Sequence, residues 1–471
     1  MPSNQTTVAP NMAEQTTLST ATKLFNKNFL LLWQGQFVSR LGNQVYSYAM
    51  IIWLATTFDS PALNGLLGML AGIPVVLLSA IGGTVADRFS RKKIIVTVDF
   101  LNGIAVLTLA ALFLFLPDSL PNKNYILLIG LFAVSIFTAT NMAFFGPAIS
   151  ASIPDIVPKK AINQANSMGQ LSRQTAQFFG MGAGARLLDV LGAPILVLID
   201  GISFIFSAFS ETFIDIPQNI PEKSKKISDQ IKQFKKDIGE GLDFIRQNRG
   251  LSRLVFFSIF SSFFATSITV LMPFYIKDTM KLPQYWLAIL LIAFGVGTMV
   301  GYGYVSISKM RGKTRGNLMV FFMVMQGSGY GLLALFPYPY IAMAIIFVGG
   351  IFNGFIVINI TTILQLTTPS HIRGRVFGVL TTISGSIAPL GMAVSGFVAE
   401  LLGGNIPLVY FGSGVMTVLI TLIMSSNRPF RKFISYQTER ELKQSGFTYT
   451  VRALEAEEIA LINKLKYREL L

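Results

Sequence analysis

The sequence has no cysteine and a single histidine in 471 residues. Disulfides and thiolate metal sites are therefore excluded, and almost no ligands remain for a zinc or iron site. The sequence also lacks a Gly-x-x-x-x-Gly-Lys-Ser/Thr phosphate loop and any cluster of acid, base and nucleophile, since His371 stands alone. Direct coupling to ATP and catalysis are thus not expected, and no metal or other cofactor is expected.

Charge is scarce as well, because only 13% of the residues are Asp, Glu, Lys or Arg. Hydrophobic residues make up 52% of the chain and the mean hydropathy is +0.57, far from a soluble globular balance. A bilayer-spanning helix needs about 20 predominantly apolar residues. We expect an all-α polytopic membrane protein with twelve transmembrane helices, near 29–57, 64–82, 94–116, 125–146, 164–190, 194–215, 252–276, 286–308, 317–336, 339–367, 374–400 and 405–425.

The net charge of +15 could indicate a nucleic-acid partner, but its distribution along the chain argues against one. With twelve spans, most lysines and arginines fall in alternate loops, and little beyond Lys123, Lys277 and Lys281 falls on the other side. Cytoplasmic loops carry the excess of basic residues. We therefore predict a multi-pass protein of the plasma (inner) membrane with both termini cytoplasmic.

The chain divides into two sets of six spans joined by a charged segment. We predict a disordered cytoplasmic N-terminal tail over 1–28, a six-helix bundle over 29–215, a cytoplasmic linker over 216–250, a second six-helix bundle over 251–425 and a cytoplasmic C-terminal tail over 426–471. Apolar residues recur at helical spacing in the linker, which predicts a basic amphipathic helix lying on the inner leaflet. Binding of a partner protein is the alternative for this helix.

A short charged turn separates the second and third expected spans. It runs from Gly83 to Lys93 and includes Asp87, Arg88, Arg91, Lys92 and Lys93. The pattern Gly-x-x-x-Asp-Arg-x-x-Arg-Lys resembles the signature loop of the major facilitator superfamily of secondary transporters. The resemblance implies two six-helix bundles and a cytoplasmic gate. Its expected members are Gly83, Asp87, Arg88, Arg91 and Lys92, facing Arg373 and Arg375 at the start of the eleventh span. The loop arginines could instead contact only anionic lipid headgroups.

Other segments narrow the resemblance. The stretches from Gly35 to Asn43, from Pro154 to Asn166, from Gly239 to Leu254 and from Pro369 to Gly378 look like the superfamily branch of siderophore (enterobactin) and macrolide exporters. The likeness covers roughly residues 25–425. Two departures stand out. Asn43 replaces the acidic residue common in that branch, and the run from Phe179 to Gly184 lacks the proline of the exporter signature.

Ionisable residues inside a bilayer are costly and need a reason. The expected spans of the first bundle hold Arg40, Asp99, Arg173 and Asp200, whereas the second bundle has almost none. One interpretation is that an arginine holds a carboxylate and locks two helices. The other is that Asp99 or Asp200 gains and loses a proton during transport, under the influence of a moving arginine. The residues alone do not choose between them.

Polar uncharged residues inside the spans should face a cavity or one another, because unpaired amides are costly in lipid. Interhelical hydrogen bonds alone would explain about half of them, and a large amphipathic solute would suit the remainder. The cavity candidates are Gln36, Asn43, Gln44, Gln170, Gln174, Gln177, Tyr302, Asn353 and Asn359. Gly295, Gly297, Gly301 and Gly303 in the eighth span predict close helix packing.

The resemblance implies a proton-coupled exporter of an amphipathic small molecule, siderophore or drug-like, that works by alternating access as a monomer. A lipid or lysolipid carrier of the same fold is the alternative within transport. A membrane receptor or scaffold that has lost transport is the alternative from another class. A membrane-embedded enzyme is the least favoured reading, because no catalytic cluster is present.

Overall fold

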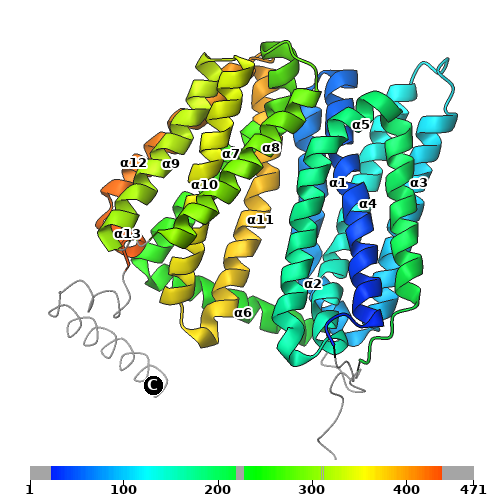
Figure 1. Cartoon of the computed structure of the whole chain (residues 1–471), viewed down its shortest axis with the longest axis horizontal. Coiled ribbons are helices and arrows are strands. Elements are labelled where there is room, and N and C mark those ends of the chain that lie inside the picture. The colour runs from blue at the N-terminus through cyan, green and yellow to red at the C-terminus, as the bar shows by residue number, and fades with distance from the viewer. Residues whose placement is uncertain (1–22, 219–226, 309, 311, 437–471) are drawn as a thin grey trace, which may run out of the picture. The chain divides into compact units, whose positions relative to one another are not determined.

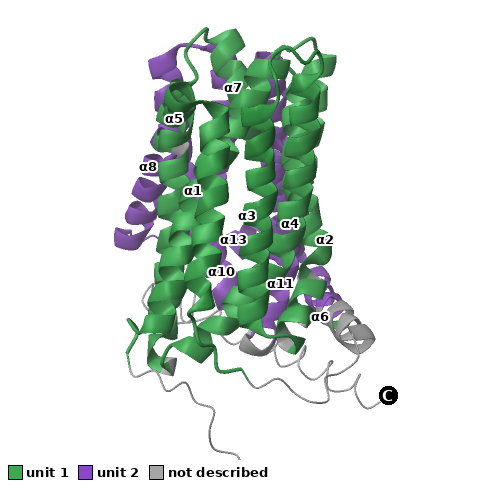
Figure 2. Ribbon diagram, turned by 90° about the vertical axis from the view of Figure 1, so that its right-hand side faces the viewer, with its two compact units in different colours: residues 1–236, 269–292, 385–405 green, residues 237–268, 293–384, 406–471 purple. Residues whose placement is uncertain are grey.

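The computed structural model describes residues 23–218, 227–308, 310 and 312–436, and every regular element among them is a helix (Figure 1). The predicted N-terminal tail up to residue 22, part of the linker (219–226) and the C-terminal tail from 437 lie outside the described residues. Two compact units are present (Figure 2). The first comprises the described part of 1–236 with 269–292 and 385–405, and the second comprises 237–268, 293–384 and the described part of 406–471.

The long helices follow the predicted spans closely. They are α1 (Lys27–Phe58), α2 (Pro61–Arg88), α3 (Arg91–Phe115), α4 (Lys123–Ile156), α5 (Ile162–Thr212), α7 (Arg249–Phe274), α8 (Tyr285–Ile307), α9 (Gly312–Leu335), α10 (Pro339–Thr367), α11 (Ser370–Leu401) and α12 (Ile406–Ser426). Short helices η2 (Lys159–Ala161) and η3 (Tyr275–Thr279) precede α5 and follow α7.

The element α5 contains two helical rods, which correspond to the predicted spans 164–190 and 194–215. Gly192 has φ 75° and ψ 163°, and Pro194 follows it, so the helix axis breaks between the two rods. A positive φ is accessible to glycine at little cost. With α5 counted as two rods, the described residues contain twelve long membrane-type helices, as the sequence predicts.

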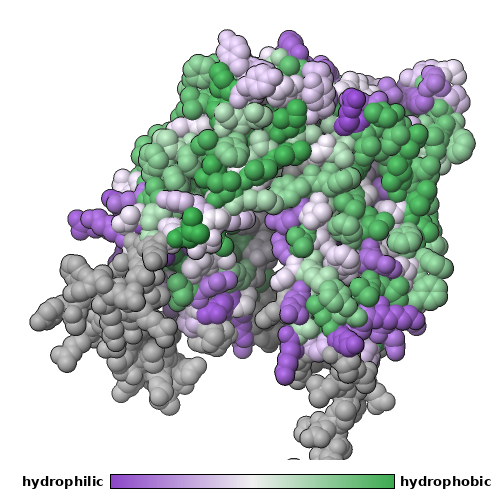
Figure 3. Space-filling view, viewed as in Figure 1, coloured by the Kyte–Doolittle hydropathy of each residue, from purple (hydrophilic) through white to green (hydrophobic). Residues whose placement is uncertain are grey.

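Ten helical segments are apolar and long enough to cross a membrane by composition alone. The helix α1 and the part of α5 before Gly182 fall outside that set, and both carry a row of polar side chains. Large apolar side chains are exposed along the others, as at Phe100, Ile104, Phe411 and Leu422. Figure 3 shows hydrophobic residues over the middle of the helices and hydrophilic residues toward their ends. Such surfaces suit lipid rather than water.

Polar caps fix several helix starts at the membrane boundary. The Asn26 side chain accepts a hydrogen bond from Phe29 N, and Ser60 and Ser90 accept from Leu63 N and Lys93 N in the same way. Each satisfies one of the backbone donors that a helix start leaves unpaired. The α1–α2 turn is also held within the first unit, because Glu400 at the end of α11 accepts from Ser60 Oγ at 2.6 Å.

Two of the four glycines predicted to pack closely, Gly297 and Gly301 of α8, do so against α10 in the second unit, whereas an added Cβ at Gly303 meets no described atom within 4 Å. A Cβ added at Gly297 or Gly301 would overlap backbone carbonyl groups of α10, and one added at Gly350 or Gly354 would overlap those of α8. Small residues on both helices therefore let the two backbones approach closely.

Two segments differ from their sequence-based interpretation. In α6 (Ile227–Gln247), the apolar residues Ile238, Leu242 and Ile245 pack into the core of the second unit rather than facing a lipid surface. Residues 428–434, assigned above to the C-terminal tail, form α13 (Arg428–Ile434), in which Phe430 is fully buried in the same core. Hydrophobic burial against protein decides both positions, and helical periodicity alone does not name the surface that is buried.

Candidate functional site

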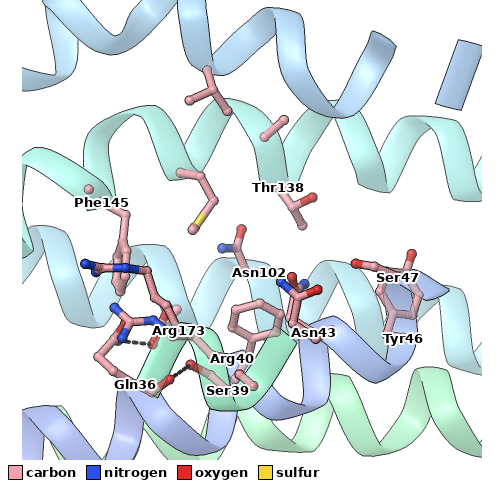
Figure 4. Close-up of a pocket in the computed structure, with 18 of the residues that line it drawn as sticks. Gln36, Ser39, Arg40, Asn43, Tyr46, Ser47, Asn102, Thr138, Phe145 and Arg173 are labelled. Carbon is pink, nitrogen blue, oxygen red and sulfur yellow. Dashed lines mark hydrogen bonds between the residues drawn. The ribbon is translucent and has the colours of Figure 1, made fainter. Parts of the chain in front are cut away.

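A cavity of about 650 Å³ lies within the first unit, among α1 to α5. One face of α1 forms its polar wall, because Gln36, Arg40, Asn43 and Ser47 recur at helical spacing and all line the cavity (Figure 4). These residues form a polar row on an otherwise apolar helix. Because the row faces the cavity and not lipid, its polar groups avoid the cost of being unsatisfied in the membrane.

The other walls come from α2, α3, α4 and both rods of α5. The cavity is completed by Ala71 and Val75 of α2, Asp99 and Asn102 of α3, Ser135, Thr138, Met142, Phe145 and Ile149 of α4, and Arg173, Ala176, Gln177 and Phe204 of α5. Asn141 donates to Asn102 Oδ1 at 2.8 Å, which ties α4 to α3 beside the cavity. The lining therefore combines amides and hydroxyls with methionine and aromatic surface, as small-molecule sites commonly do.

Close approach of α1 and α5 shapes the polar wall. A Cβ at Gly180 would overlap the Cβ of Gln44 and lie 2.8 Å from its carbonyl carbon. A Cβ at Gly42 would lie 3.1 Å from Asp200 Oδ1. Both rods of α5 therefore pack closely on α1. The first rod does so at its own Gly180 and the second does so at Gly42 of α1, because glycine has no side chain to keep the helices apart.

The predicted cavity residues divide by unit. Gln36, Asn43, Gln44 and Gln177 line the cavity, and Gln170 accepts hydrogen bonds from Arg173. Gln174 is not among the lining residues. Tyr302, Asn353 and Asn359 belong to the second unit and do not line this cavity; the buried Asn359 donates to Phe355 O of its own helix at 2.8 Å.

All four predicted intramembrane charges lie in this region. Arg40, Arg173 and Asp99 line the cavity, and Asp200 is fully buried behind α1. Among the described residues, neither arginine forms an ion pair with Asp99 or Asp200; the ion pairs found there are Arg91–Asp155, Lys123–Asp118, Lys277–Asp59 and Arg375–Glu240. The arginine lock between helices is therefore not the arrangement found.

Gln36, and neither Arg40 nor Arg173, contacts the buried carboxyl groups directly. Its Nε2 donates to Glu211 Oε1 at 2.7 Å and approaches Asp99 Oδ2 at 3.4 Å, so one amide on α1 joins carboxyl groups from α3 and α5. Asp99, Asp200 and Glu211 are all at most 1% exposed. Ser207 lies near Asp99 and Glu211, and Asn43 lies near Asp200. Within the described part of the chain, however, Asp99 Oδ1, Asp200 Oδ2 and Glu211 Oε2 form no hydrogen bond of good geometry. Unpaired buried carboxyl groups are costly and mark candidate functional sites.

Sequence reasoning missed Glu211. It stands one residue before the end of α5, where a charge is usually solvated. The signal was nonetheless available, because Asp200, Ser203, Ser207 and Glu211 follow one another at intervals of three or four residues. That spacing places a polar stripe on one face of an apolar helix.

Comparison with known proteins identifies the architecture. The family model described as Major Facilitator Superfamily matches residues 32–392, most of the chain. The chain belongs to the Major Facilitator Superfamily. It is therefore a multi-pass membrane transporter of a small-molecule substrate, and not an enzyme.

Relatives and solved structures agree with this assignment. Macrolide efflux protein A of Streptococcus pyogenes is 24% identical over 412 residues, which cover 86% of this chain and 96% of that protein. Multidrug efflux pump Tap of Mycolicibacterium fortuitum is 23% identical over 361 residues, covering 74% and 84%. The crystal structure of nucleoside transporter NupG shares the fold, with a TM-score of 0.63, 15% identity, and coverage of 87% of this chain and 99% of that one.

The signature loop of this transporter is tied to its own unit. Arg91 forms an ion pair with Asp155 in the last turn of α4 and donates to Ala151 O of the same helix at 2.9 Å. Arg91 N donates to Gln218 Oε1 at 2.8 Å, so the segment after α5 joins the same cluster. Lys92 is half-buried, and Gly83 has no neighbour within 4 Å of an added Cβ. Arg88 Nε and Nη2 are buried, and neither forms a hydrogen bond within the part of the chain that the structure describes.

The predicted partners of the loop on α11 have contacts within the second unit. Arg375 forms an ion pair with Glu240 of α6, and Arg373 donates to Thr368 O from Nε and Nη2 at 3.3 and 3.2 Å. Sequence reasoning did not single out Glu240, because an acidic residue on an amphipathic helix reads as a solvated one. The Asp87 side chain lies outside the part of the chain that the structure describes.

Proposed function

We propose that this transporter exports an amphipathic small molecule, drug-like or siderophore-like, by alternating access driven by the proton gradient. The efflux names of the relatives support the direction, and the excess of basic residues in alternate loops supports a cytoplasmic location of both termini. The protein then acts as a monomer in the plasma (inner) membrane, surrounded by lipid. The gate formed by Gly83, Asp87, Arg88 and the start of α11 is part of this proposal.

The carboxyl cluster Asp99–Gln36–Glu211 is the observation that carries proton coupling. An ionised carboxylate is expensive away from water unless it is paired, and a carboxyl group avoids that cost by holding a proton. Asp99 lines the cavity while Glu211 lies behind Gln36. A proton shared by this pair can leave only to an acceptor such as water that reaches Asp99 from the cavity, which links proton exchange to access.

The competing functions fit the cavity less well. A lipid or lysolipid carrier needs room for an acyl chain, whereas this cavity presents Arg40, Arg173 and Asp99 beside several amides. A receptor or scaffold would gain nothing from three buried carboxyl groups with unpartnered oxygens. In a transporter, by contrast, the cost of burying these carboxyl groups has a function, because they gain and lose a proton during each transport cycle.

The test uses inside-out membrane vesicles or proteoliposomes with an imposed pH gradient and two fluorescent amphipathic probes, the cation ethidium and an anionic dansyl carboxylate. Wild-type protein should move at least one of the two probes, and only while the gradient stands. The Glu211→Gln variant should insert normally and lose at least tenfold of gradient-driven transport. Asp215→Asn is the matched control, since Asp215 lies four residues further along the chain and is exposed. Efflux that continues after an ionophore collapses the gradient would reject the coupling.

A further inference from the structure

Arg40 and Arg173 lie on the same cavity, on α1 and on the first rod of α5. Figure 4 shows both side chains at the same end of the cavity, near Phe145 and Gln36. The Arg40 guanidinium interacts electrostatically with Arg173, a charge of the same sign. Among the described residues, neither has an ion-pair partner. The cavity wall therefore holds two like charges, and neither is in direct contact with a carboxylate of the described residues.

The Arg173 guanidinium is held in place by a neutral group. Gln170 Oε1, one helical turn earlier, accepts from Arg173 Nε at 3.0 Å and from Nη2 at 2.7 Å. A guanidinium has five N–H donors in a planar fork, and this arrangement uses only the Nε edge. The Nη1 group and the second Nη2 hydrogen stay available. An orienting amide fixes the direction of the fork without neutralising its charge.

The nearby carboxyl groups do not neutralise the two arginines. Arg40 also interacts electrostatically with Asp99 and Glu211, but at no distance that forms an ion pair. Gln36 engages both of those carboxyl groups instead. Arg40 is half-buried and Arg173 is exposed on the cavity wall, so a solute can reach both guanidinium groups. An anion that enters the cavity would accept charge-assisted, bidentate hydrogen bonds from them.

Arg40 and Arg173 line a second, smaller cavity as well as the main one. A smaller cavity of about 110 Å³ shares Gln36, Arg40, Ile149, Ser150 and Arg173 with the main one. Its remaining wall is largely apolar and includes Phe29, Leu32, Trp33 and Ile153. An acidic group bound by both arginines would thus have polar space on one side and a small apolar recess on the other.

We propose that Arg40 and Arg173 together bind the acidic group of the transported molecule, so that the substrates of this protein are amphipathic anions carrying a carboxylate, sulfonate or phosphate. This inference rests on the proposed transport function and specifies its substrate class. The same chemistry could come from the headgroup of an anionic lipid, which the experiment below distinguishes.

Binding can be measured with three dansyl probes on one scaffold, carrying a carboxylate, a neutral amide or a tertiary amine. Trp33 borders the smaller cavity and is one of only three tryptophans, so energy transfer from tryptophan to dansyl reports occupancy. In neutral-lipid nanodiscs, the carboxylate probe should bind at least tenfold more tightly than the amide, and the amine should bind most weakly. Arg173→Gln and Arg40→Gln should each remove at least tenfold of carboxylate affinity and leave amide affinity unchanged.

Arg186→Gln is the matched control, since Arg186 is exposed on the same rod and does not line either cavity. Arg173→Lys, which keeps the charge and loses the fork, should recover part of the affinity. If Arg40→Gln fails to fold, Arg173→Gln still carries the test, because among the described residues the Arg173 side chain hydrogen-bonds only to Gln170. Equal binding of the three probes, or an Arg173→Gln affinity equal to that of Arg186→Gln, would overturn the inference.

Two further arms separate the sources of the anion and the two proposals. The carboxylate probe should be transported in proteoliposomes and should keep its affinity when phosphatidylglycerol is added. Displacement by phosphatidylglycerol without probe transport would make the site a lipid site and refute the assignment to cargo. If ethidium efflux follows the pH gradient while no anion binds, only the substrate class fails. If nothing moves under any gradient, the transport proposal itself fails.

Discussion

The substitution Gly180→Ala should loosen the contact between α1 and the first rod of α5, and the distances around Gly180 show how far the two helices must separate. The new methyl carbon would overlap the Cβ of Gln44 and stand 2.8 Å from the Gln44 carbonyl carbon. Carbon atoms in contact are normally about 3.5–4.0 Å apart, so the gap to be opened is roughly 1 Å. The obstructing atoms include backbone, which cannot rotate away as a side-chain tip would. The helices themselves must separate.

Overpacking of this kind costs about 1–3 kcal/mol. Alanine returns up to about 1 kcal/mol through its better helix propensity, so a net loss of roughly 1–2 kcal/mol is expected. At about 2–4 °C per kcal/mol, the scale for domains of 150–250 residues, the unfolding midpoint should fall by several degrees. Transport should fall as well, because Gln44 and Gln177 line the cavity on the two helices that move apart.

The assay is thermal unfolding of the purified protein in detergent, followed by intrinsic fluorescence. Gly169→Ala is the control, because Gly169 lies on the same rod and an added Cβ there meets nothing within 4 Å. That variant should gain the propensity term and unfold at the same or a slightly higher temperature. Equal midpoints for Gly180→Ala and Gly169→Ala would refute the close approach of α1 and α5.

Three further predictions concern packing and ion pairs. Ile245→Ala should destabilise the protein by about 2–4 kcal/mol, because Ile245 is only 4% exposed and lies in the core of the second unit. Lys236→Ala on the exposed face of α6 is the control, and an equal unfolding midpoint for the two variants would mean that α6 does not pack on protein. Asp155→Asn should lower the midpoint measurably, because the side chains of Arg91 and Asp155 are only 18% and 28% exposed and the substitution removes the carboxylate charge from this partly buried ion pair; an unchanged midpoint would show that the pair does not contribute to stability. Glu240→Gln should change the free energy of unfolding by less than about 1 kcal/mol, because the paired side chains of Arg375 and Glu240 are 38% and 35% exposed and solvent screens their attraction. A larger loss in chemical denaturation would contradict this.

Local patterns in the sequence determined the helices and the family. Hydropathy along about 20 residues identifies each rod, and the turn between two apolar runs identifies the signature loop. The polar row on α1 was also visible, since Gln36, Asn43 and Gln44 are neighbours on one helix. These properties depend on residues close together in the chain, and so periodicity alone is enough to find them.

The tertiary structure decided which polar groups meet. Gln36 reaches Asp99 across 63 residues and Glu211 across 175, and no local pattern links those positions. It also decided that the arginines face a cavity without a carboxylate partner, and that α6 and α13 bury apolar faces in protein. Hydrogen bonds and packing between helices depend on the rotation of each rod about its axis. Neighbouring rods set that rotation, and the sequence of a single rod does not encode it.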